Sequence, residues 1–359
     1  MAFPLEASVV YDLLAQQFVL GTIWKVLLII LILTNIKLLP GVWHIRMLNT
    51  MRFVLRSYRS KHGPSPAQLF QPVIISSHAP LAEIDYNIHK SNSTYFADLD
   101  IARSHLVCTL FSSAIEQARG SKSDELFGGG NNTFGLALGA VSCTFKREVK
   151  PYEKYEMWTR ILSWDNKWIY VVTHFVRKDR VRPRFFTLYR DQNFTNGRPS
   201  KAHLKDDAII ASALSKCVFK KGRLTITPEV MLQASGLLPP RPGEPAVTRR
   251  PTTKAPKKAL AAELLNGPFR CFEMADVWWD ATKKNLMPEA ELSGDESTDW
   301  QDKQKTEAWT WERVESERRR GLELANHLSS LGNLEREFTG EAEALGCHND
   351  LFWLLGLTY

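Results

Sequence analysis

Three polar side chains with catalytic potential lie at alternating positions in one short segment: Asp85, Asn87 and His89. In an extended segment, residues at positions i, i+2 and i+4 point to the same side, so these side chains are predicted to line one cavity. A carboxylate can activate water or attack a carbonyl carbon, and a histidine can orient a substrate or carry a proton. These groups are suited to hydrolysing a thioester. The alternative is that they are ordinary turn and capping residues between a strand and a helix.

A long helix is predicted directly after this segment, from Ser93 to about Arg119, with Ser91 or Asn92 as its N-terminal cap. Its apolar face comprises Phe96, Leu99, Leu106, Leu110 and Ala114. The free N–H groups of a first helical turn carry a partial positive charge, which suits them to polarising a carbonyl oxygen. The catalytic candidates therefore precede a natural site for the carbonyl group of a substrate.

Stretches rich in β-branched and aromatic residues predict strands on both sides of this helix. They cover residues 73–84, 134–148, 155–164, 168–177 and 208–219. A strand, a long helix and then several antiparallel strands indicate an α+β fold in which the sheet wraps around the helix. Such a sheet leaves an edge or a face open, so we expect a homodimer.

Residues 83–103, EIDYNIHKSNSTYFADLDIAR, resemble a segment of the hotdog-fold thioesterases, D-x-D-x-x-x-H-x-N-N-x-x-Y-x-x-x-x-D-x-A-R. Residues 151–170 resemble the strand pair of that family, and residues 221–229 resemble the segment after its last strand. The resemblance covers residues 43–238 and is greatest to membrane-anchored thioesterase-like proteins related to 4-hydroxybenzoyl-CoA thioesterases. Thioesterases of fungal secondary metabolism look similar.

This resemblance implies a hotdog fold that hydrolyses an acyl thioester of coenzyme A or an acyl-carrier protein at a membrane surface, releasing a fatty-acyl or polyketide acid. Asp85 matches the family's base or nucleophile, and the same three residues match the D-x-N-x-H of plant acyl-ACP thioesterases, where all three are assigned to catalysis. No metal and no cofactor is expected. The catalytic candidates are Asp85, His89 and Asn87, and the substrate-binding candidates are Asn92, Ser93 and Tyr95.

The sequence departs from the family pattern at three places in this segment. Glu83 replaces the first Asp, Ile88 replaces a frequent Gly, and Ser91 replaces the first Asn. Two alternative functions follow: a non-catalytic scaffold that binds acyl-CoA or an acyl chain, and a hotdog hydratase or dehydratase. Glu116 is a candidate second carboxylate on the long helix.

Residues 18–39 are almost entirely apolar and long enough to predict a transmembrane helix after a short segment, residues 1–17. No basic residue precedes them and no cleavage site follows, so a cleaved signal peptide is disfavoured. The basic residues downstream predict a single-pass protein with its catalytic domain in the cytosol. Residues 43–61 predict a basic amphipathic helix, either on lipid headgroups or against the folded domain.

The net charge of +7 is scattered along the chain, which argues against nucleic acid as a partner. The five cysteines are an odd number without a CxxC pair, which argues against a disulfide framework and structural zinc. The predicted hotdog domain covers residues 65–238. A Pro/Lys/Arg-rich linker is predicted at 239–259, and a Trp-rich helical extension at 260–359.

Overall fold

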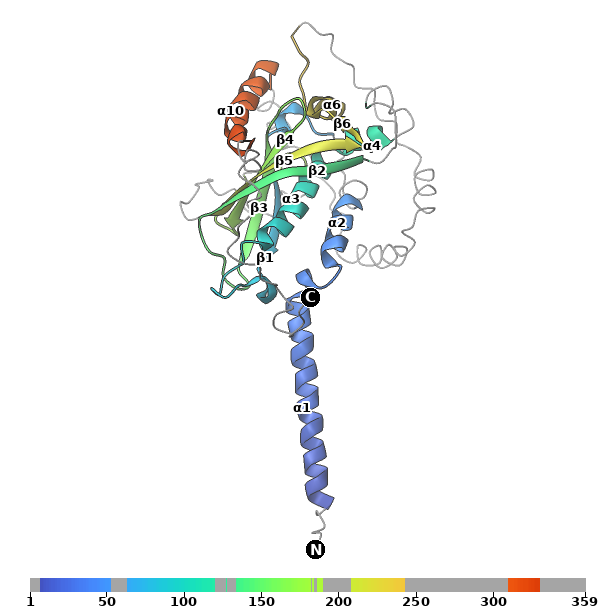
Figure 1. Cartoon of the computed structure of the whole chain (residues 1–359), viewed down its shortest axis with the longest axis vertical. Coiled ribbons are helices and arrows are strands. Elements are labelled where there is room, and N and C mark those ends of the chain that lie inside the picture. Colours follow the sequence, from blue (N-terminus) through green and yellow to red (C-terminus); the bar gives the residue numbers. More distant parts are fainter. Residues whose placement is uncertain are drawn as a thin grey trace, which may run out of the picture. The chain divides into compact units, whose positions relative to one another are not determined.

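The computed structural model describes residues 7–52, 63–119, 127, 134–181, 183, 186–189, 208–242 and 309–329 (Figure 1). Its centre is one antiparallel sheet with the strand order β1-β3-β4-β5-β2, and the short strand β6 pairs with β5. The strands are β1 (Val73–His78), β2 (Phe134–Phe145), β3 (Lys154–Trp164), β4 (Ile169–Arg177), β5 (Ile209–Lys221) and β6 (Leu224–Ile226). The predicted antiparallel sheet is confirmed.

Helix α3 (Thr94–Leu110) lies across one face of this sheet, and α4 (Ser112–Arg119) continues the chain after Phe111. The core between α3 and the sheet includes Leu99 and Ala102 of the helix and Met157 and Phe175 of the strands, all fully buried. The sheet therefore wraps around a long helix, which is the hotdog-like arrangement that the sequence predicted. Phe96, expected on the buried face, is instead exposed.

The first strand is shorter than predicted, because it ends at His78 rather than at residue 84. Pro80 is extended and precedes a 3-10 helix, η4 (Leu81–Glu83), so the chain leaves the sheet there. Proline has no N–H to donate to a neighbouring strand, which makes it a natural end for strand pairing. This early break places Asp85 in a loop beside α3 and not in a strand.

Helix α10 (Trp311–Ser329) packs against β3 and β4 through a second apolar cluster, which contains Leu162, Tyr170 and Ala325. Gly321 allows this approach, because a Cβ atom there would collide with the carbonyl oxygen of Leu162. This helix makes up most of residues 309–329, which are the described part of the predicted C-terminal extension. The rest of that extension, and all but residues 239–242 of the predicted linker, lie outside the described residues.

The N-terminal elements are α1 (Ala7–Thr34), η1 (Ile36–Leu38) and α2 (Val42–Arg52). Among the described residues, no helix has the length and apolar character needed to cross a bilayer. The predicted single-pass anchor at 18–39, with its membrane localisation, is therefore wrong. That stretch is not one helix, because α1 ends at Thr34 and the side chain of Lys37 is buried in ion pairs with Glu83 and Asp98.

Helix α2 packs along α3, with Met47, Thr50 and Arg46 in contact with that helix (Figure 1). The hydroxyl group of Thr50 lies 2.9 Å from Nε2 of His105, and the guanidinium group of Arg46 lies 3.3 Å from the carboxylate of Asp98. Helix α2 therefore lies against the folded domain, which is one of the two placements that the sequence allowed. Residues 53–61 of the predicted amphipathic helix lie outside the described residues.

Candidate functional site

Residues 84–90 form a closed loop between η4 and α3. An isolated antiparallel bridge joins Ile84 to Lys90, and the backbone N–H of Asp85 donates to the carbonyl oxygen of His89 at 2.9 Å. The N–H of Ser91 donates to the carbonyl oxygen of Glu83 at 2.8 Å. The segment is therefore folded back on itself, and it is not the extended strand from which side-chain alternation was predicted.

Folding back brings Asp85 and His89 together across the loop. His89 Nδ1 lies 3.5 Å from Asp85 Oδ1, and the two side chains are 21% and 22% exposed. The backbone N–H of Asn87 donates to the same Asp85 oxygen at 2.9 Å, while Asn87 itself is exposed at the tip of the loop. A carboxylate held in this way can take a proton from water, and the adjacent imidazole can accept or return a proton.

The first turn of α3 lies next to this pair in the sequence. Asn92 and Ser93 are exposed there, and Ser93 makes no capping hydrogen bond with its side chain. Thr94 instead closes the turn, because its hydroxyl group donates to the carbonyl oxygen of Ser91 at 2.7 Å. The backbone N–H groups of Thr94 and Phe96 donate to the carbonyl oxygens of Ser91 and Ser93 at 3.1 and 3.3 Å. The partial positive charge of this helix end is suited to a substrate carbonyl oxygen.

Tyr95, the third predicted substrate-binding residue, is buried in the core. Its ring packs edge-on against Phe145 and Phe175, with ring centroids 5.1 and 4.9 Å apart. Burial, with smaller contributions from Cys143 and Asp98, raises the pKa of the Tyr95 phenol. The structure thus places Asp85, Asn87, His89, Asn92 and Ser93 at the surface of one loop and helix end, and Tyr95 beneath them.

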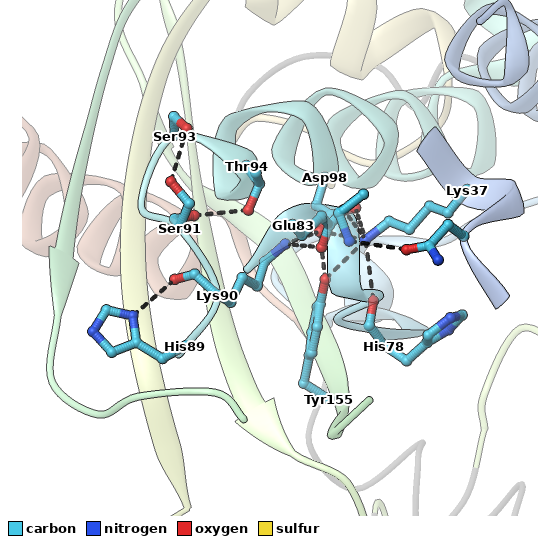
Figure 2. Close-up of polar contacts among 12 residues, drawn as sticks. Lys37, His78, Glu83, His89, Lys90, Ser91, Ser93, Thr94, Asp98 and Tyr155 are labelled. Carbon is cyan, nitrogen blue, oxygen red and sulfur yellow. Dashed lines mark hydrogen bonds and ion pairs between the residues drawn. The ribbon is translucent and has the colours of Figure 1, made fainter. Parts of the chain in front are cut away.

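Beneath the loop lies a buried charge cluster, which consists of Lys37, Glu83, Lys90, Asp98 and Tyr155 (Figure 2). The Lys37 ammonium group lies 2.7 Å from Glu83 and 3.0 Å from Asp98. Lys90 forms ion pairs with Glu83 and, at 3.1 Å, with Asp98. The Tyr155 hydroxyl group donates to Asp98 and accepts a hydrogen bond from Lys37 at 3.1 Å.

The charges in this cluster determine the protonation of Asp98. Complete burial alone would raise the pKa of this carboxyl group. The nearby ammonium groups of Lys37 and Lys90, and the hydrogen bonds from Tyr155 and Lys37, outweigh burial and lower the pKa to about 2. Asp98 is therefore ionised at neutral pH, and its negative charge is needed to balance the two buried ammonium groups.

Figure 2 shows how the loop connects the surface pair to the cluster. The His89 side chain points away from the cluster, whereas the Lys90 side chain extends into it toward Glu83. Glu83 and Lys90 thus stand at the two ends of the loop that carries Asp85 and His89. Sequence reasoning missed this cluster; the only signal for it was a lysine at the end of an apolar stretch, Lys37.

A cavity of about 350 Å³ lies between α2, α3 and β2. Its apolar lining includes Met47 and Met51 of α2, Val107 and Cys108 of α3, and Leu136 of β2. Its polar lining comprises Asp100, Arg103, Ser104 and Arg119. Glu116, the candidate second carboxylate, does not line it and is exposed on α4, beyond the C-terminal end of α3.

Comparison with known proteins gives a consistent result. A family profile described as the thioesterase-like superfamily matches residues 79–234. The probable thioesterase atnL of Emericella nidulans is 35% identical over 245 residues, which cover 62% of this chain and 78% of that protein. Thioesterase lcsJ of Purpureocillium lilacinum is 36% identical, with 61% and 73% covered. Thioesterase poxG of Penicillium oxalicum is 34% identical, with 60% and 71% covered.

The matched residues contain the closed loop, α3 and the whole described sheet except β1. They also contain four members of the buried charge cluster. The fifth, Lys37, precedes the matched region by more than forty residues and belongs to η1.

Proposed function

The chain belongs to the thioesterase-like superfamily and is a thioester hydrolase, and from this premise we propose that Asp85 and His89 carry the reaction on an acyl thioester of coenzyme A or an acyl-carrier protein. The observation that carries this proposal is the 3.5 Å contact between the two side chains on a partly exposed loop. Asp85 and His89 precede Thr94, the first residue of α3, by nine and five residues.

In the proposed reaction, the thioester carbonyl oxygen faces the start of α3, whose partial positive charge stabilises the negative charge that develops on that oxygen. Asp85 takes a proton from water as the water oxygen attacks the carbonyl carbon. The carbon–sulfur bond then breaks, and the thiolate receives a proton through His89. The products are the free acid and the free thiol.

A second form of the same chemistry has Asp85 attack the carbonyl carbon itself and form an anhydride that water then opens. In single-turnover hydrolysis in ¹⁸O-labelled water, label in the Asp85 carboxylate would identify an anhydride that water opens at the Asp85 carbon. Label in the released acid alone is expected when Asp85 acts as a base, and also when water opens the anhydride at its acyl carbon.

The direct test is thiol release from a panel of acyl-CoA and acyl-carrier substrates by the full chain and by Asp85→Asn. Removing a general base typically lowers the rate by about 10²–10⁴-fold, so Asp85→Asn should lose turnover by that factor with little change in thermal stability. Wild-type turnover in Asp85→Asn would refute the role of this residue. If the wild-type chain binds acyl-CoA tightly and turns over none of the substrates, the result would instead support the alternative of a non-catalytic scaffold.

We place the acyl chain of the substrate in the cavity beside α3. Its volume of about 350 Å³ lies within the range of small-molecule sites. Val107 lies thirteen residues after Thr94, roughly 20 Å along the helix at about 1.5 Å per residue, so a chain that follows α3 must be long to reach it. Val107→Phe should lower kcat/KM for long acyl chains and leave short chains unaffected. An equal effect on both would contradict this placement.

We also propose that the enzyme is a homodimer joined through β2, which forms one edge of the described sheet. Its Leu138 side chain is 45% exposed, and an unpaired edge strand favours pairing with a second copy. Light scattering of the purified protein should give twice the chain mass of 40.9 kDa. A mass equal to one chain at micromolar concentration would refute this assembly.

A further inference from the structure

The buried charge cluster lies directly beneath the loop that carries the proposed catalytic pair. We propose that the Glu83–Lys90 ion pair, completed by Asp98 and Lys37, is a positioning device that fixes the distance between Asp85 and His89. This inference rests on the proposed function of those two residues. It assigns a role in catalysis to Lys37, which lies outside the residues matched by the family profile.

The first step of the argument is the position of the ion pair in the loop. Glu83 precedes Asp85 by two residues, and Lys90 directly follows His89. Their side chains point into the core and meet there, while the two catalytic candidates meet on the outside at 3.5 Å. A change in the separation of Glu83 and Lys90 must therefore change the separation of the outer pair.

The second step concerns how the ion pair is itself held. Lys90 contacts Asp98 of α3 at 3.1 Å, and its backbone N–H donates to the carbonyl oxygen of Val149 at 2.8 Å. Glu83 contacts Lys37 at 2.7 Å. Both ends of the loop are thus held by other elements. The Lys90 end is connected to α3 and to the chain after β2, and the Glu83 end is connected to η1.

The third step is charge balance in a site that excludes water. The cluster holds two carboxylates and two ammonium groups, with the guanidinium of Arg46 at 3.3 Å from Asp98 at its margin. Removing Lys37 leaves Glu83 and Asp98 to compete for the single buried ammonium group of Lys90. Since a buried unpaired charge is strongly unfavourable, Lys90 must shift toward one of them and the loop must follow.

An independent observation supports the need for such a device. Ile88, at the tip of the loop, has a φ of 62°. This left-handed conformation is a genuine outlier for a β-branched residue. Strained backbone persists only where its surroundings over-determine it, and it is concentrated at functional sites. The bridge at Ile84 and Lys90 and the ion pair beneath it provide that constraint.

The experiment uses the full chain and measures kcat, KM, the pH profile of kcat and thermal stability. The variants are Lys37→Met, Lys90→Met and Glu83→Asp, with Lys37→Arg as the conservative rescue. Because a displacement of about 1 Å can cost about 10²-fold in rate, we expect the first three to lower kcat by about 10- to 100-fold with little change in KM. The acidic limb of the pH profile should move in Lys90→Met, and Lys37→Arg should retain most of the activity.

Arg318→Met is the matched control. Arg318 pairs with Glu315 at 2.7 Å and donates to the carbonyl oxygen of Trp164 at 3.0 Å, at the opposite end of β3 from Tyr155. Trp164 lies nine positions after Tyr155 in the strand, roughly 30 Å at about 3.3 Å per residue. This variant should lose stability and keep the wild-type kcat and pH profile.

The outcomes separate this inference from the proposed function. Turnover that persists in Asp85→Asn refutes the proposed function, whatever the cluster variants do. Loss of turnover in Asp85→Asn, together with wild-type kcat and pH profile in folded Lys37→Met and Lys90→Met, refutes only the positioning role. If the lysine variants do not fold, Glu83→Asp decides, because it keeps the negative charge and shortens the side chain by one methylene group, which withdraws the carboxylate from Lys90. Wild-type kcat and pH profile in that variant would overturn the inference.

Discussion

The stability of the protein should fall in acid through the protonation of Asp98. The pKa of this carboxyl group falls from an ordinary value of 3.8 to about 2 in the folded protein. One pKa unit corresponds to about 1.4 kcal/mol, so ionised Asp98 contributes about 2 kcal/mol to the free energy of unfolding. Because the pKa is lowered on folding, that contribution is complete above about pH 4 and is lost as the pH falls toward 2.

The groups that face Asp98 account for this expectation. They are the Lys37, Lys90 and Arg46 cations, the Tyr155 hydroxyl group and the Glu83 carboxylate. Urea unfolding of the wild type and of Asp98→Asn should be compared from pH 7 to pH 2.5. Carboxyl groups outside the buried charge cluster titrate in the same way in both proteins, so the difference between the two free energies reports on the cluster that contains Asp98.

At neutral pH, Asp98→Asn should lower the free energy of unfolding by about 3–5 kcal/mol, because it leaves two buried ammonium groups with one full carboxylate partner. This difference should shrink by about 2 kcal/mol between pH 5 and pH 2.5. A difference that stays constant over this range would show that Asp98 does not titrate with a lowered pKa, and would refute the assignment of Asp98 as a buried carboxylate stabilised by Lys37 and Lys90.

Two further predictions concern the backbone. Ile88→Gly removes a left-handed strain of about 1–2 kcal/mol and costs about 0.5–1 kcal/mol in glycine entropy, so the free energy of unfolding should rise by about 0.5–1 kcal/mol in urea unfolding. The Ile88 side chain is 73% exposed, so little burial is lost, and a lower urea midpoint would contradict the strain. Gly321→Ala places a Cβ atom against the carbonyl oxygen of Leu162, so this variant should lower the free energy of unfolding by about 1–3 kcal/mol. Thermal unfolding measures this loss, and an unchanged Tm would contradict the close packing of α10 on β3.

Much of the fold was predictable because it depends on local periodicity. The alternation along β3 and the apolar face of α3 are properties of short stretches. β3 begins and ends within one residue of the prediction, and α3 begins one residue after the predicted start. The single helix predicted to run to about Arg119 is instead two helices, because α3 ends at Leu110 and α4 covers the remainder. The predicted strand end at Ile84 was wrong because one proline, Pro80, stops strand pairing earlier than the apolar composition suggests.

The buried charge cluster was not predictable in this way. Lys37 meets Asp98 and Tyr155 across separations of 61 and 118 residues, and no local pattern records such contacts. Hydropathy describes composition and not partners, so the apolar stretch before Lys37 predicted a membrane span. The closed loop was missed for a related reason, since side-chain alternation assumes an extended chain and the hydrogen bond from Asp85 to His89 folds it back.

The burial of Lys90 has a consequence for an enzyme that handles activated acyl groups. A deprotonated lysine amine is a good nucleophile and a frequent target of acylation, and Lys90 is the immediate neighbour of His89 in the sequence. Its side chain is fully buried, and its ammonium group is engaged by Glu83 and Asp98. Lys90 is therefore shielded from self-acylation, although it adjoins His89 in the sequence.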